Sequence, residues 1–138
     1  HNMKFATAIL LLLVLGSAFA QNASPAASRE INQLFAALEN SRCEFNRNGT
    51  WHSAHAATEH LQRKYDYLLK KDLVTSAESF IDLAATRSSR SGKPYLVRCG
   101  NAQPVPSKSW FTSRLEELRG RPAGADDSFK PTPPGGAE

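Results

Sequence analysis

SREINQLFAALENSRCEFNRNG, residues 28–49, contains the two patterns that decide the fold. Its first part places apolar side chains at positions i, i+3, i+4 and i+7, the stripe of an amphipathic helix, and Ser28 is suited to cap that helix. The stripe consists of Ile31, Leu34, Phe35 and Leu38. The second part alternates over residues 43–47 and ends in Asn48-Gly49, a strong signal for a tight turn. The stretch therefore predicts a helix followed by a strand, and leaves residues 50–52 as either a return strand or the start of the next helix.

Three more helices and one more strand are predicted farther along the chain. Ser53 is expected to cap a helix over residues 54–70, Thr75-Ser76-Ala77-Glu78 fits a capping box that opens a third, and Ser107 is expected to cap a fourth. Residues 86–94 (TRSSRSGKP) and 101–106 are predicted loops around a strand at 95–99. The expected core positions of these helices are Ala57, Leu61, Tyr65, Leu68, Phe80, Ile81, Ala84, Trp110, Phe111, Leu115 and Leu118. We therefore predict a helix-dominated α+β fold of about four helices with a small two- to three-stranded antiparallel sheet.

The two ends of the chain differ in composition from this folded unit. Residues 5–15 form an apolar run of the length of a signal h-region, too short for the roughly 20 residues of a membrane span. Ala18-Phe19-Ala20 then supplies a small-x-small cleavage site. We expect a tag remnant plus signal peptide over 1–20, cut between Ala20 and Gln21, a flexible leader over 21–27, one folded domain over 28–119 and a disordered Pro/Gly-rich tail over 120–138. Such a chain is exported to the periplasm or secreted.

Cys43 and Cys99 are the only two cysteines. In an oxidising compartment the two cysteines are expected to form a single disulfide. Because it closes a long loop in the unfolded chain, this disulfide should stabilise the fold by roughly 4 kcal/mol. Two buried free thiols are the alternative. Two cysteines alone are too few for a structural zinc site.

The histidines and serines offer no recognised catalytic or metal-binding pattern. On a helix, His55 and Glu59 share one face, whereas His60 is rotated away from it. The pattern H-x-x-x-E-H also differs from the spacings of the metalloprotease motifs. We therefore expect these histidines to be solvated side chains on a helix face. No G-x-S-x-G motif is present, and Gly92-Lys93 lacks the other residues of a phosphate-binding loop. We therefore predict no metal, no cofactor and no catalytic residue, with a cryptic envelope hydrolase as a third hypothesis.

The charge distribution is more informative. The chain carries a net charge of +4, and no acidic residue lies between Asp82 and Glu116. A basic segment attracts anions such as phosphates or an acidic protein surface, although a solvated face without a partner is the alternative. Nucleic acid is not expected, because export removes the usual targets. The candidate binding residues are Arg87, Ser89, Arg90, Ser91, Lys93 and Tyr95.

A resemblance supports the predicted location. The shared residues are Arg47-Asn48-Gly49, Ala57, His60-Leu61, Phe80-Ile81 and, most specifically, the run SSRSGKPY at 88–95. On these residues, the segment 45–95 resembles the YfeK-like family of small Gram-negative periplasmic proteins, a domain of unknown function. The resemblance implies size and location, and it implies neither a reaction nor the disulfide. SGKPY (91–95) is also similar to the S-G-x-x-Y loop of some periplasmic lysozyme inhibitors.

Together these features predict an exported, non-catalytic periplasmic interaction protein that modulates envelope physiology or growth, including a delivered growth inhibitor in bacterial competition. Its expected partner is a periplasmic or envelope protein with an acidic surface or cleft. The alternative is an inhibitor or immunity protein that acts against a lysozyme-like peptidoglycan hydrolase through the basic SGKPY loop. The sequence leaves the oligomeric state open.

Overall fold

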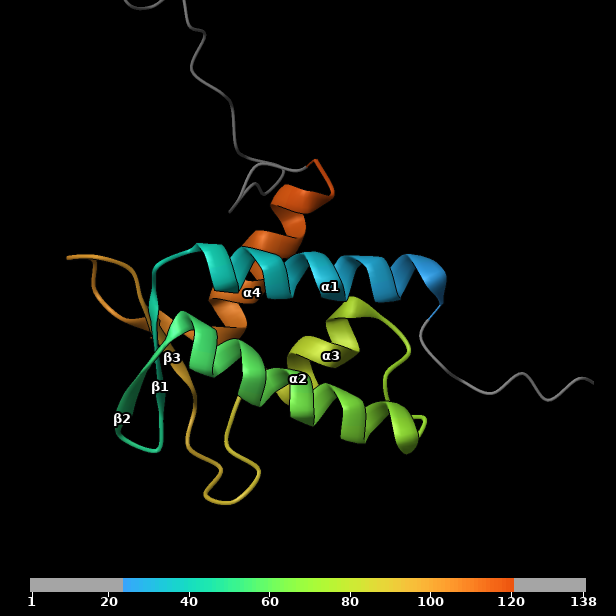
Figure 1. Ribbon diagram of the computed structural model, residues 1–138, viewed down its shortest axis with the longest axis horizontal. Helices are drawn as coiled ribbons and strands as arrows, with labels where there is room; N and C mark the ends of the chain where they lie inside the picture. Colours follow the sequence, from blue (N-terminus) through green and yellow to red (C-terminus); the bar gives the residue numbers. More distant parts are fainter. Residues whose placement is uncertain (1–23, 121–138) are drawn as a thin grey trace, which may run out of the picture.

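Residues 24–120 are described by a computed structural model, and within them four helices and four strands form the helix-dominated α+β fold that the sequence predicts (Figure 1). The elements are α1 (Pro25–Asn40), β1 (Glu44–Arg47), β2 (Thr50–Ser53), α2 (Ala54–Lys70), α3 (Ala77–Ala84), β3 (Leu96–Arg98), β4 (Val105–Pro106) and α4 (Ser107–Leu118). The predicted signal peptide with its cleavage site, the first part of the predicted leader, and the predicted tail after Gly120 lie outside the described residues.

Helix α1 begins four residues earlier than predicted. Ser24, not Ser28, is the N-cap, and its side chain accepts a hydrogen bond of 3.1 Å from the backbone N–H of Ala27. Pro25 occupies the first helical position, where its missing N–H costs nothing and its fixed φ suits a helix. The end of the predicted leader is therefore helical, and Ala27 is already buried.

The strands form one antiparallel sheet in the order β2-β1-β3-β4. Asn48 and Gly49 both have positive φ, as a type I′ hairpin turn requires, so residues 50–53 return as a strand and Ser53 then caps α2. The predicted sheet lacked β4, which pairs with β3. Two residues that include Pro106 are too few to show an alternating pattern.

Two predicted helix starts are corrected. In α3 the N-cap is Ser76, and the reciprocal bond of the capping box comes from Ser79 instead of Glu78. In α4 Pro106 holds the N-cap position and Ser107 is the first residue of the helix, where its N–H donates to the carbonyl of Tyr95 at 2.8 Å. Within residues 24–120 the buried hydroxyl of Ser107 has no hydrogen-bond partner.

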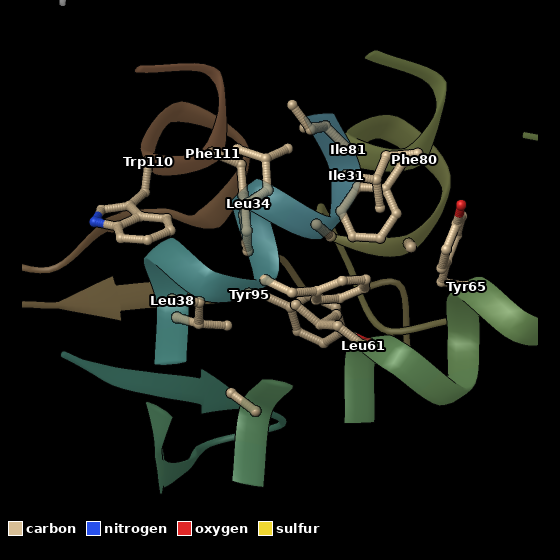
Figure 2. Close-up of a cluster of buried hydrophobic side chains, with 14 of the residues drawn as sticks. Ile31, Leu34, Leu38, Leu61, Tyr65, Phe80, Ile81, Tyr95, Trp110 and Phe111 are labelled. Carbon is tan, nitrogen blue, oxygen red and sulfur yellow. The ribbon is translucent and has the colours of Figure 1, made fainter. Parts of the chain in front are cut away.

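The helices meet around Phe80 (Figure 2). Its ring lies 5.2 Å from that of Phe35 on α1, 5.6 Å from Tyr65 on α2 and 6.3 Å from Phe111 on α4, between ring centroids. All predicted helical core positions are buried except Leu118, which is 42 % exposed near the end of α4. One aromatic side chain from each helix therefore forms the centre of the core.

The predicted disulfide is present and joins Cys43 to Cys99. Glu44 on β1 pairs with Arg98 on β3, so the two cysteines extend this strand pair by one step. The covalent bond thus holds the ends of two strands that are 56 positions apart along the chain.

Replacing both cysteines in C43S/C99S should lower the free energy of unfolding by about 4 kcal/mol, because the unfolded chain regains the entropy that the closed loop removes. Urea unfolding of the two proteins measures the difference. Reductant should destabilise the wild type and leave C43S/C99S unchanged. Equal stability of the wild type with and without reductant would contradict this prediction.

Candidate functional site

A cleft of about 680 Å³ opens where three segments meet: the turn end of the β1–β2 hairpin, helix α2 and the loop 86–94. In Figure 1 this loop descends from α3 toward the hairpin turn before the chain enters β3. The hairpin and α2 follow one another directly in the chain, whereas the loop comes after α3, so the tertiary fold brings the loop to the other two segments.

The hairpin contributes the side of the sheet that faces the helices. Side chains alternate along a strand, so Arg47 points to the same face as buried Phe45, two residues earlier. Their cross-strand partners are Thr50 and His52, and both line the cleft together with Arg47. The inner face of the sheet therefore changes from core to cleft between residues 45 and 47.

Helix α2 contributes a second stripe beside its core stripe. His60, Arg63 and Lys64 are spaced i, i+3 and i+4, so they lie on one face of the helix, and all three line the cleft. Arg63 is exposed, whereas His60 and Lys64 are partly buried.

The loop wall is held in place by hydrogen bonds to Ser88. Its hydroxyl oxygen accepts from the backbone N–H groups of Arg90 at 3.2 Å and Ser91 at 3.3 Å, and from the amide of Asn48 at 3.3 Å. The Ser91 hydroxyl in turn donates to the Asn48 side-chain oxygen at 2.6 Å. Asn48 therefore fastens the loop to the hairpin turn, which gives the cleft two connected walls.

Tyr95 connects the cleft to the core. Its residue is only 1 % exposed, yet its hydroxyl accepts a hydrogen bond of 3.1 Å from the Lys64 ammonium and lies 3.3 Å from Nε2 of His60. Arg47 donates to Nδ1 of His60 at 2.9 Å. A neutral His60 that accepts at Nδ1 carries its proton on Nε2, directed at the tyrosine oxygen.

The cleft is strongly electropositive. Four cationic side chains line it, and none of the lining residues is acidic; the cations are Arg47, Arg63, Lys64 and Arg90. Burial, reinforced by the charges of Arg47 and Lys64, lowers the pKa of His60 to about 4. Burial and the Arg47 charge lower the pKa of Lys64 to about 8. Like charges held together in a partly buried site would be stabilised by a bound anion.

The predicted binding residues are only partly brought together. Ser89 and Arg90 line the cleft, and Tyr95 lines it through its hydroxyl end. Arg87, Ser91 and Lys93 are exposed residues of the same loop that do not line it.

Sequence reasoning missed the contributions of the hairpin and of α2. The missed residues are Arg47, Asn48, Thr50, His52, His60, Arg63, Lys64 and Ser88. Exposed His55 fits the predicted solvated helix face, whereas His60 does not. The available signal was the i, i+3, i+4 stripe of basic residues on α2. Between residues 24 and 120, no three His, Cys, Asp or Glu side chains gather in a way that could hold a metal ion.

The fold and the cleft define a small, disulfide-closed α+β protein with a cationic cleft. The chain belongs to a family of unknown function, DUF5329, whose model matches residues 25–119. No curated protein and no solved structure matches the chain. The resemblance predicted a domain of unknown function, and the family match confirms that part of the prediction. The match does not identify this family as the YfeK-like one. In the described part of the chain, no helix is both long and apolar enough to span a bilayer.

The pKa values of His60 and His55 should be shifted in opposite directions from the ordinary histidine value, and one NMR titration measures both. His60 should titrate near pH 4, whereas hydrogen bonding to Glu39 and the charges of Glu39 and Glu59 raise the pKa of His55 above 6.5. The substitution R47Q should raise the pKa of His60, though not fully to 6.5 because burial is the larger cause. It should leave His55 unchanged. An unchanged pKa of His60 in R47Q would show that the Arg47 charge does not act on this side chain.

Proposed function

We propose that this protein is an exported, non-catalytic binding protein that holds an anionic group of an envelope protein in the basic cleft. The observation that carries the proposal is the charge of the cleft: four cations line it without a carboxylate. A concave site with convergent polar groups is the usual form of a binding site. Through this partner the protein would modulate envelope physiology or growth, including as a delivered inhibitor in bacterial competition.

The chemistry of the cleft favours recognition over hydrolysis. A general base works best when its pKa lies near the working pH, and His60, with a pKa of about 4, is a weak base. Lys64, with a pKa of about 8, comes closer to this condition, but its ammonium donates hydrogen bonds to the Arg87 carbonyl and the Tyr95 hydroxyl and is held there as a donor. The hydroxyl oxygen of Ser88 already accepts three hydrogen bonds and has no basic side chain among these partners. A cryptic envelope hydrolase is therefore the less supported hypothesis.

The disulfide supports the proposed location. Disulfides form and persist in oxidising compartments outside the cytoplasm. The periplasm is the compartment that both the predicted signal peptide and the YfeK-like resemblance favour, and we propose it as the site of action.

The outer tip of the loop supports a second candidate function, an inhibitor or immunity protein against a lysozyme-like hydrolase. Gly92, Lys93 and Pro94 are exposed, so the ammonium of Lys93 could enter a carboxylate-lined cleft of such an enzyme. However, Ser91 is hydrogen-bonded to Asn48 and Tyr95 is buried. Only the middle of the SGKPY motif is therefore available to a partner.

The cleft proposal predicts that R63S/R90S captures its partner at least roughly tenfold less well than the wild type, because two charge contacts are lost. The measurement is a pull-down from Gram-negative periplasmic extract, quantified by mass spectrometry. The matched control R29S/K70S removes two exposed cations that do not line the cleft. Equal capture by folded R63S/R90S and wild type would contradict the proposal.

The inhibitor alternative makes a different prediction about the same loop. K93S should relieve inhibition of a lysozyme-type hydrolase in a cell-wall lysis assay, whereas R63S/R90S should inhibit as the wild type does. Absence of inhibition by the wild type would remove this candidate and leave the cleft proposal intact.

A further inference from the structure

A second hollow, of about 470 Å³, adjoins the basic cleft. The two hollows share four lining residues, His60, Arg63, Lys64 and Ser89, so they form one continuous depression. Beyond these shared residues the second hollow is lined by three apolar or aromatic side chains, Tyr67, Leu68 and Leu83. We call this part the apolar groove.

The apolar groove exposes side chains that a helix usually buries. Tyr67 is 60 % exposed and Leu83 is 46 % exposed, while Leu68 is almost fully buried. Tyr67 follows Arg63 by four positions and Lys64 by three, so it continues the basic stripe of α2 by one helical turn. The stripe therefore changes from cationic to apolar along a single helix face, and Leu83 of α3 lines the apolar end.

We propose that the cleft and the apolar groove together bind one acidic–apolar peptide segment of a partner protein. The carboxylate of this segment lies among the cleft cations, and a neighbouring large apolar side chain lies against Tyr67 and Leu83. This inference rests on the proposed function and adds the chemistry of the partner. Charge complementarity selects the acidic group, and the continuity of the two hollows requires the apolar group to be adjacent to it.

The size of the apolar surface favours a peptide side chain over a lipid tail. Because Leu68 is nearly buried, Tyr67 and Leu83 provide most of the accessible apolar lining. Two such side chains can cover one Leu or Phe side chain. An acyl chain gains membrane-like stabilisation from each methylene that it buries, and it would need a longer apolar path.

Three blocked peptides, acetylated and amidated to remove terminal charges, test the inference by NMR titration of the full chain. They are Asp-Asp-Phe-Leu, Asp-Asp-Gly-Gly and Gly-Gly-Phe-Leu. The wild type should bind the first roughly tenfold more tightly than the second, the gain expected from burying one large apolar side chain. L83N should abolish this difference without changing the affinity for Asp-Asp-Gly-Gly. L73N is the matched control, because Leu73 is 50 % exposed and does not line the apolar groove.

The outcomes separate this inference from the proposed function. Equal affinity of the wild type for the two acidic peptides, or an unchanged difference in L83N, would overturn the acidic–apolar inference, while weaker Asp-Asp-Gly-Gly binding by R63S would still support the basic cleft. No binding of either acidic peptide would overturn both. Vesicles of phosphatidylcholine with phosphatidylglycerol provide the lipid comparison. Binding of the wild type to these vesicles, lost in L83N, with no preference for Asp-Asp-Phe-Leu, would replace the peptide with a lipid.

Discussion

The position of Tyr95 is the constraint on which both the core and the cleft depend. Its ring packs against Phe45 with the centroids 5.0 Å apart, while its backbone N–H donates to the carbonyl of Thr86 and its own carbonyl accepts from Ser107. The hydroxyl at the far end of the same side chain meets Lys64 on α2. One residue therefore joins the sheet, the loop, α4 and α2. Because its ring is fixed by core packing, the base of the cleft has a fixed position as well.

The ion pairs of the described residues lie outside the cleft. Away from the cleft, four basic side chains pair with carboxylates: Arg98 with Glu44, Lys108 with Asp82, Arg114 with Glu117, and Arg119 with both Glu30 and Glu78. Within residues 24–120, no ion pair joins a cleft cation to a carboxylate. Exposed ion pairs contribute little to stability, so their distribution says more about recognition than about folding. The cleft therefore gathers four cations on a concave surface without a carboxylate, whereas other exposed cations, such as Arg29 and Lys70, are spread over the surface outside it.

Patterns within a few residues predicted most helices and strands, whereas contacts between distant residues determined strand β4 and most of the cleft. The α1 stripe and the Asn48-Gly49 turn are encoded within a few residues, and both were predicted from the sequence. Strand β4 was missed because it exists through pairing with β3, and the cap of α4 was misassigned because Pro106, which has no side-chain capping bond, holds that position. The cleft could be predicted only on its loop side. His60 lies beside the core stripe of α2, and its partial burial comes from residues of the sheet that no helical pattern reveals.

Every residue that lines the cleft or the apolar groove lies between Cys43 and Cys99. The cleft and the apolar groove are therefore part of a covalent ring, with all of α1 and all of α4 outside it. Arg90 is exposed on the loop and is followed by Ser91, so a trypsin-like envelope protease would find a cleavage site there, whereas the Lys93–Pro94 bond resists such an enzyme. A single cut there opens the ring but releases no fragment, because the disulfide still joins the two pieces. The nicked protein keeps both walls of its cleft in one molecule, so proteolysis must cut the ring twice before it can remove part of the site.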